Sequence, residues 1–166
     1  MGTHVILALG SNMGNRIGYL RRARSFCRQL RADHAPEASC SRIYESAPIG
    51  PADAPFLNAI IGIYTRLSPF SLLRKLKAFE TAEGRRQDAP RWSNRPIDLD
   101  IIAYGSRIMH TPMLKIPHVA YAQRRFVLLP LQDISPEWRD PRTSLSLPEL
   151  LSRAPQMQLH PTSLTW

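Results

Sequence analysis

Two aspartates, Asp98 and Asp100, lie in the segment RWSNRPIDLDI that spans residues 91–101. Apolar residues alternate with them, which is the pattern of a strand that carries both carboxylates on one face. Two carboxylates so placed can bind Mg²⁺, which prefers oxygen ligands and is usually shared with substrate phosphates. The alternative for an isolated Asp-x-Asp is a pair of solvated carboxylates on an exposed sheet face.

Several cations precede these aspartates, namely Arg85, Arg86, Arg91 and Arg95. Arginine pairs with phosphate and carboxylate through two parallel hydrogen bonds, so this cluster suits a nucleotide triphosphate beside a metal site. The whole chain has a formal charge of +9 and a pI near 10.4, which indicates a polyanionic partner, either nucleic acid or nucleotide. A basic surface kept for solubility would explain the charge equally well.

Other phosphate-binding patterns are absent from the sequence. The P-loop pattern G-x-x-x-x-G-K-[ST] occurs nowhere. The segment ALGSNMGNR (8–16) follows a predicted strand but lacks the G-x-G-x-x-G spacing, so we do not expect a dinucleotide fold. The structural alternative for Gly10, Ser11 and Asn12 is turn chemistry between a strand and a helix, and we favour it for Gly10 and Gly14.

The elements that must position these groups alternate between strand and helix. Apolar runs predict strands over 4–10, 39–46 and 56–65, and helical spacing predicts helices over 16–31 and from the N-cap Ser68 to about Gly84. Residues 97–110 predict a hairpin that turns at Gly105-Ser106, and 126–134 predict a helix that Pro130 should kink or shorten. This order predicts an α+β, ferredoxin-like sandwich with a mainly antiparallel sheet flanked by helices.

The length and composition favour one domain over residues 1–166. The chain has 166 residues, 43% of them hydrophobic and 21% charged, which is ordinary for a globular protein. The sequence leaves open whether the tail from about 140 to 166 is ordered. No apolar run approaches the roughly 20 residues of a membrane span, the N-terminus lacks a secretory signal, and the two cysteines are expected to be reduced. We therefore expect a cytoplasmic protein without a membrane partner.

Five segments that follow one another in the sequence resemble the 6-hydroxymethyl-7,8-dihydropterin pyrophosphokinase family. They are ALGSNMGN, YESAPIGPADAPFLNA, EGRRQDAPRWSNRPIDLDI, IPH and RRFVLLPL, and they extend over about residues 5–138. The resemblance implies an enzyme of folate biosynthesis that transfers pyrophosphate from ATP to the hydroxymethyl group of a dihydropterin and releases AMP. It also implies two Mg²⁺ ions, ATP as co-substrate and three mobile loops. We expect a monomer that binds these small molecules and no nucleic acid.

The resemblance also assigns roles to individual residues. The metal ligands would be Asp98 and Asp100. The ATP-binding residues would be Glu80, Arg85, Arg95, Ile101, Leu114, His118 and Arg124. The pterin would contact Ser46, Ala47, Ile49, Phe56, Asn58 and Phe126. Arg85, Arg95 and the loop residue Trp92 would act in catalysis.

Each assignment has a structural alternative. Phe56 and Phe126 could be core aromatics, Trp92 could make a surface cation–π contact, and His118 could be a turn residue. Asn58 is harder to explain structurally, because a buried amide needs partners that an apolar strand does not offer.

Departures from the family pattern keep other functions open. Ser93-Asn94 replaces a common Gly-Pro, which predicts a more flexible loop and a tighter-binding Asn94→Pro variant. Val119 replaces an aromatic, and Ala47 replaces a proline. A paralogue that is inactive or acts on another pterin is one alternative. A basic RNA-binding module is another, although its central strands should carry aromatics that NAIIGIYT largely lacks.

Overall fold

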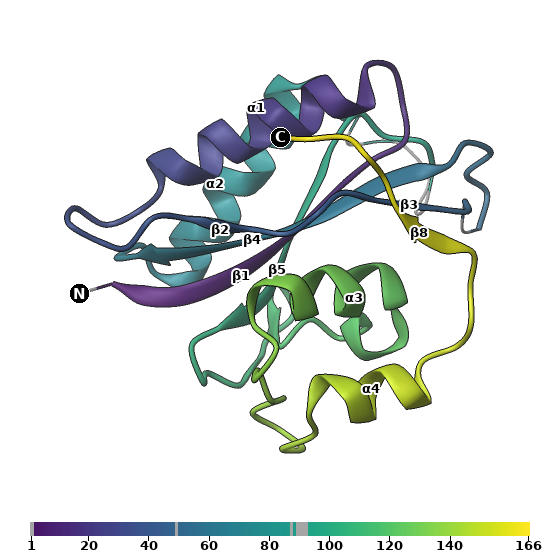
Figure 1. Ribbon diagram of the computed structural model, residues 1–166. Coiled ribbons are helices and arrows are strands. Elements are labelled where there is room, and N and C mark those ends of the chain that lie inside the picture. The colour runs from purple at the N-terminus through teal and green to yellow at the C-terminus, as the bar shows by residue number, and fades with distance from the viewer. Residues whose placement is uncertain (1, 49, 87, 89–92) are drawn as a thin grey trace.

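The computed structural model describes residues 2–48, 50–86, 88 and 93–166, which form one main sheet with helices on both faces (Figure 1). In chain order the elements are β1 (Thr3–Ser11), α1 (Arg16–Gln29), β2 (Ser39–Cys40), β3 (Tyr44–Ser46), β4 (Phe56–Thr65), α2 (Pro69–Ala82), β5 (Asp98–Tyr104), β6 (Met109–His110), β7 (Lys115–Ile116), a 3₁₀ turn η1 (Tyr121–Gln123), α3 (Arg125–Ile134), α4 (Leu147–Arg153) and β8 (Leu159–Pro161). The predicted α+β class is confirmed.

The sheet is antiparallel throughout and is centred on β1 and β4. These two strands pair over their full length, from Thr3 opposite Thr65 to Ser11 opposite Leu57. The strand order is β5-β1-β4-β3-β8, and β2 also pairs with β4. Every pairing in the sheet is antiparallel. The order of β5, β1, β4 and β3 is that of a ferredoxin-like fold, as the sequence predicted.

Helices cover both faces of this sheet. In Figure 1, α1 and α2 lie on one face, and α3 and α4 lie on the other. Successive side chains of β1 therefore enter different cores: Leu7 packs in the cluster beneath α1 and α2, and Ile6 in the cluster beneath α3 and α4. Burial on both faces explains why the central strands are almost continuously apolar.

The strand register gathers three connections at one end of the sheet. Gly10, near the end of β1, lies opposite both Asn58 of β4 and Asp98 of β5. The loop that leaves β1, the loop that enters β4 and the loop that enters β5 therefore meet at this end. α1 starts directly after the first of them, where the N-cap Asn15 accepts a hydrogen bond of 3.0 Å from the backbone N–H of Gly18.

The predicted strand over 39–46 is interrupted. Cys40 lies opposite Ile61 and Tyr44 lies opposite Asn58, so four steps along one strand match three along the other. This extra residue is the signature of a β-bulge. At the interruption the Ser41 hydroxyl accepts the 2.9 Å hydrogen bond from the backbone N–H of Ile60.

The hairpin predicted over 97–110 is wrong. The chain does turn after Tyr104, with Gly105 at φ 53°, but β6 pairs with β7 in a separate two-stranded sheet. Other groups already bond the outer edge of β5. At Leu99 the backbone N–H donates to Glu80 at 2.6 Å and the carbonyl accepts from Lys77 at 3.0 Å. A strand returning from Gly105-Ser106 would extend only to about Ile101, and within that stretch the Ile102 carbonyl instead accepts from the backbone N–H of His118 at 3.0 Å.

The C-terminal third completes the second layer. α3 runs four residues past Pro130 to Ile134, so the proline does not end it. The tail whose order the sequence left open forms α4, capped by Ser146 and Glu149, and β8, which pairs with β3. Among the helices of the described residues, none has the length and apolar character that crossing a bilayer requires.

Candidate active site

The floor of the site is a row of residues across three strands. Asp98, Gly10 and Asn58 lie opposite one another on β5, β1 and β4, so they face the same side of the sheet. Asp100 lies beside Ala8 in the same way. Because the two β1 residues are small, the sheet is hollow between the carboxylates and the amide. These residues line a cavity of about 930 Å³.

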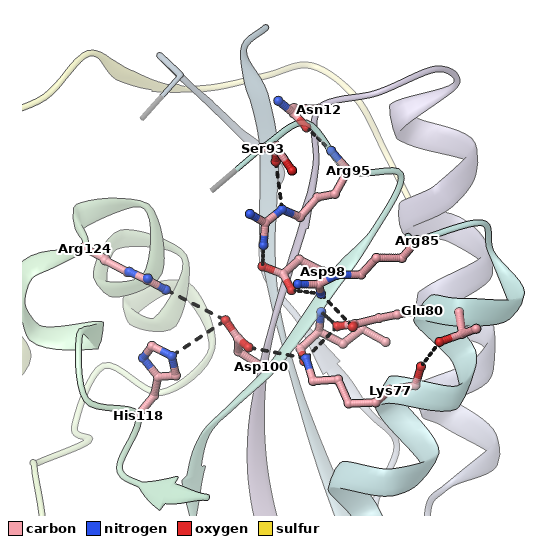
Figure 2. Close-up of polar contacts among 12 residues, drawn as sticks. Asn12, Lys77, Glu80, Arg85, Ser93, Arg95, Asp98, Asp100, His118 and Arg124 are labelled. Carbon is pink, nitrogen blue, oxygen red and sulfur yellow. Dashed lines mark hydrogen bonds and ion pairs between the residues drawn. The ribbon is translucent and has the colours of Figure 1, made fainter. Parts of the chain in front are cut away.

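Asp98 is held by two guanidinium groups. Arg85 donates from Nη1 to Asp98 Oδ1, and Arg95 donates from Nη1 to Asp98 Oδ2 at 2.9 Å (Figure 2). Burial alone would raise the pKa of Asp98, but the neighbouring cations, Arg85 first among them, outweigh burial and lower the pKa below its ordinary value. Asp98 is therefore a carboxylate at neutral pH.

Asp100 is surrounded more loosely, by two cations and a histidine. Lys77 Nζ lies 3.8 Å from Asp100 Oδ1, and His118 Nε2 and Arg124 Nη1 each lie 3.8 Å from Oδ2. Figure 2 shows Asp100 between Lys77 on one side and His118 and Arg124 on the other. At 3.8 Å none of these contacts is a hydrogen bond.

The orientation of His118 is fixed by its own loop. Its backbone N–H donates to Ile102 of β5 at 3.0 Å, and its Nδ1 accepts from the backbone N–H of Ala120 at 3.2 Å. With Nδ1 as acceptor, the neutral ring carries its proton on Nε2, the atom that faces Asp100. Burial lowers the pKa of His118 despite the charge of Asp100. His118 is thus a neutral donor aimed at this carboxylate.

Glu80 connects α2 to the site from beneath. Its carboxylate, almost fully buried, accepts hydrogen bonds from Lys77 Nζ at 2.8 Å and Arg85 Nη1 at 2.6 Å. It also accepts the 2.6 Å bond from Leu99 that was described above. Burial raises the pKa of Glu80 despite the opposing charge of Lys77. Glu80 therefore positions two cations of the site and the strand that carries both aspartates.

On the far side of the cavity, the lining side chains include one amide and two aromatic rings. Asn58 donates from Nδ2 to Ser46 Oγ at 2.9 Å and to the Phe56 carbonyl at 3.4 Å, so the strand does offer the partners that the sequence did not reveal. Among the described residues, none donates a hydrogen bond to Asn58 Oδ1. Phe56 and Phe126 both line the cavity. The Arg124 guanidinium lies 5.7 Å from the Phe126 ring centre.

The structure brings most of the predicted residues together. Those that line the cavity are Ser46, Phe56, Asn58, Glu80, Arg85, Arg95, Asp98, Asp100, His118, Arg124 and Phe126. Ile101 and Leu114 are buried in the core beneath α1 and α2 instead. Ala47 donates its backbone N–H to Gln158 at 3.2 Å, in the segment before β8. Ile49 and Trp92 fall outside the described residues.

Sequence reasoning missed three residues. Lys77, which touches both Glu80 and Asp100, could have been found from its i, i+3 spacing to Glu80 on a predicted helix. Asn12, for which a turn role was one of the alternatives, donates from Nδ2 to Asn94 Oδ1 at 2.7 Å. Asp53 accepts from Asn94 Nδ2 at 2.5 Å. The last two contacts join separate loops, so no local pattern points to them.

Comparison with known proteins identifies the family of the chain. The profile of the 7,8-dihydro-6-hydroxymethylpterin-pyrophosphokinase (HPPK) family matches residues 6–136. The chain is 39% identical over 155 residues to the 2-amino-4-hydroxy-6-hydroxymethyldihydropteridine pyrophosphokinase of Pseudomonas aeruginosa, with 91% of each chain covered. It is 38% identical over 145 residues to the Bacillus subtilis protein of that name, with 87% of this chain and 85% of the relative covered.

Solved structures agree in fold. The HPPK-DHPS of Plasmodium falciparum, crystallised as wild type with SDX-DHP, matches with a TM-score of 0.71 at 15% identity. The match covers 92% of this chain and 44% of the Plasmodium chain, so this chain spans less than half of that longer protein. With the family profile and the relatives, the chain belongs to the 7,8-dihydro-6-hydroxymethylpterin-pyrophosphokinase family, enzymes of folate biosynthesis that transfer a pyrophosphoryl group from ATP to hydroxymethyldihydropterin.

Proposed function

We propose that this pyrophosphokinase carries out its transfer in the cavity between Asp98, Asp100 and Asn58, with two Mg²⁺ ions held by the two aspartates. The hydroxyl oxygen of the pterin attacks the β-phosphorus of ATP, the bond to the α-phosphate breaks, and AMP leaves. The observation that carries the proposal is the position of both carboxylates on one face of β5, among five cationic side chains that line the same cavity.

The chemistry of the donor set fits Mg²⁺. Asp98 and Asp100 offer hard oxygen atoms, and the described residues contain no group of three or more His, Cys, Asp or Glu side chains that could hold a metal by themselves. Mg²⁺ usually takes only one or two carboxylates and completes its shell with water and substrate phosphates. When bound, Mg²⁺ would neutralise phosphate charge and stabilise the attacking and leaving oxygens.

The arginines have two successive roles in this proposal. Without nucleotide, Arg85 and Arg95 neutralise Asp98 through the hydrogen bonds described above. A triphosphate presents oxygens that match the same guanidinium donors. We propose that the two arginines exchange Asp98 for phosphate when nucleotide binds. They would then stabilise the charge that spreads over the transferred group.

The cations around Asp100 come from other elements and receive other parts of the substrate. Lys77 belongs to α2, and Arg124 precedes the first turn of α3. We propose that Arg124 and His118 contact the phosphates and that Lys77, which sequence reasoning missed, adds a third contact. No described side chain is required as a general base here, because positioning and electrostatic stabilisation can supply much of the catalysis in phosphoryl transfer.

The pterin is proposed to occupy the opposite side of the cavity. Asn58 Oδ1 can accept from the amino edge of the pterin while its Nδ2 is held by Ser46. Phe56 and Phe126 would stack on the two faces of the ring. Three assignments remain predictions from the family resemblance. They are the pterin contacts of the Ala47 and Ile49 backbone, the adenine contacts of Ile101 and Leu114, and the closing role of Trp92.

The smallest active unit is proposed to be a monomer in the cytoplasm. All the groups named above come from one chain, so a partner subunit is not required. Substrates of this kind, ATP and a reduced pterin, suit a reducing compartment, as do the two free thiols.

The test measures AMP release with a coupled assay that contains ATP, Mg²⁺ and 6-hydroxymethyl-7,8-dihydropterin. We expect turnover that disappears when the divalent cation is chelated. A pterin without the hydroxymethyl group is the matched control and should yield no AMP. Equal AMP release with this control pterin would overturn the proposed acceptor, and turnover in the presence of chelator would overturn the role of Mg²⁺.

A further inference from the structure

The Asn94 side chain joins two loops that are distant in the sequence. Its Oδ1 accepts from Asn12 Nδ2 at 2.7 Å and from the backbone N–H of Asp53 at 3.4 Å. Its Nδ2 donates to Asp53 Oδ1 at 2.5 Å. Both polar atoms of the amide are thus used between loops. Neither a glycine nor a proline at position 94 could make any of these side-chain bonds.

Asn12 extends the same connection into the backbone. Its side chain, which is buried, accepts from the backbone N–H of Arg95 at 2.8 Å and donates to the Ala54 carbonyl at 3.2 Å. Its own N–H donates to the Arg95 carbonyl at 3.3 Å, and Figure 2 includes the contact between the two residues. Three connections therefore meet at this amide pair: one after β1, one before β4 and one before β5.

The joined segments lead to opposite sides of the cavity. Arg95 follows Asn94 directly and reaches Asp98, on the side proposed for the nucleotide. Asp53 precedes β4, whose first residue Phe56 and third residue Asn58 form the side proposed for the pterin. A movement of either segment is transmitted to the other as long as the Asn94–Asp53 bonds persist.

We infer that Asn94 is a positioning residue that couples the binding of nucleotide and pterin, through its bonds to Asp53 and Asn12. The inference rests on the proposed placement of the two substrates. Nucleotide that draws Arg95 away from Asp98 shifts the segment that carries Asn94, and the side-chain bonds pass this shift to the Asp53 segment on the pterin side. By thermodynamic reciprocity, the pterin must raise the affinity for nucleotide by the same factor. The expectation that Asn94→Pro tightens binding considered only backbone freedom, and the same substitution would also remove these bonds.

A charge swap tests this coupling. Asn94→Asp places a carboxylate against Asp53 and removes the Nδ2 donor. Asp53→Asn keeps an acceptor for Asn94. The double variant Asn94→Asp/Asp53→Asn restores a donor facing an acceptor, with the direction reversed, and it also restores the net charge. Asp33→Asn is the matched charge control, because Asp33 is exposed in the turn after α1, where Ala32 bonds Tyr64 at the opposite end of β4.

The measurement is pterin affinity by calorimetry, with and without Mg²⁺ and α,β-methylene-ATP, which cannot transfer its pyrophosphoryl group. In Asn94→Asp we expect the nucleotide-induced gain in pterin affinity to fall at least about fivefold, the low end of ordinary coupling between sites. Asp53→Asn and Asp33→Asn should retain most of the gain, and the double variant should recover it. Thermal unfolding of each variant reports on folding.

The outcomes separate this inference from the proposed function. Wild-type protein that binds neither ligand would overturn the proposed function itself. Wild-type protein that binds both ligands, with the same nucleotide-induced gain in Asn94→Asp, would overturn only the coupling role. A double variant that is no better than Asn94→Asp would also overturn it, because then the carboxylate at position 94 itself, rather than the lost bond to Asp53, explains the single variant.

Discussion

Asp98 and Asp100 lie two residues apart on the same face of β5, but different parts of the molecule neutralise them. Asp98 is hydrogen-bonded by Arg85 and Arg95, which both belong to the connection between α2 and β5. Asp100 has no cation closer than 3.8 Å among the described residues. Asp98 is thus hydrogen-bonded by residues of one loop, whereas the cations near Asp100 come from α2 and from the residue that precedes α3.

The difference indicates which part of the site must rearrange. A ligand that takes Arg85 and Arg95 leaves Asp98 able to bind a cation, so nucleotide and metal should bind there together. The groups around Asp100 lie 3.8 Å from it and line the cavity, so a phosphate need not break a hydrogen bond to Asp100 to reach them. We therefore expect the Asp98 side to change with nucleotide and the Asp100 side to remain nearly preformed.

The largest effect is expected from removing either carboxylate. Asp98→Ala and Asp100→Ala should each lower turnover by at least about 10²–10³-fold, the cost of losing one group that stabilises charge in the transition state. Circular dichroism should report an intact fold for both. Near-normal AMP release from either variant would contradict the two-metal mechanism at that position.

The next effect concerns the aromatic side of the cavity. Phe126→Ala should weaken pterin binding by about 1–3 kcal/mol, the scale of stacking a base on an aromatic side chain. ATP binding should change little, and calorimetry with each ligand separately makes the measurement. If the loss falls on ATP instead, the two substrates have been assigned to the wrong sides of the cavity.

Stability without ligands compares the two aspartates directly. Asp98→Asn weakens two charge-assisted hydrogen bonds and should lower the free energy of unfolding by about 1–3 kcal/mol. Asp100→Asn loses only longer ion pairs and should cost about 1 kcal/mol or less. Urea denaturation of both variants measures the difference. Equal costs would mean that Arg85 and Arg95 do not hold Asp98 in solution as they do here.

The smallest effect is expected at Lys77. Lys77→Met should weaken ATP binding about fivefold, equivalent to about 1 kcal/mol, because Arg124 and His118 still face Asp100. Lys75→Met is the matched control, since Lys75 is exposed on the same helix. Identical ATP affinities for the two variants would remove Lys77 from the nucleotide site.

The carboxylate pair could be predicted from sequence because it depends on a local rule. Alternation along one strand places Asp98 and Asp100 together regardless of the rest of the fold, and β4 and α2 began at the predicted residues for similar reasons. The assignments of the phosphate and pterin residues depended on the family resemblance. Neither source revealed how each carboxylate is neutralised.

The failures involve groups that are distant in sequence. The predicted hairpin failed because β6 pairs with β7, and His118, from beyond β7, bonds the Ile102 carbonyl of β5. At position 94 the sequence suggested only a less stiff loop, because the residues that bond the Asn94 side chain are 41 and 82 positions away. The assignment of Ile101 and Leu114 to the adenine stays a prediction, and burial of their side chains was not foreseen from sequence. In each case, the environment that decides the outcome is created only by the tertiary fold.

Binding of Mn²⁺, a paramagnetic substitute for Mg²⁺, tests the assignment of the metal site most directly. The free ion can be counted by electron paramagnetic resonance, with and without α,β-methylene-ATP, in wild type, Asp98→Asn and Asp100→Asn. We predict weak binding without nucleotide, two ions per chain with it, and the loss of at least one ion in each variant. Retention of two nucleotide-dependent ions by both variants would contradict the assignment of these aspartates as the metal ligands.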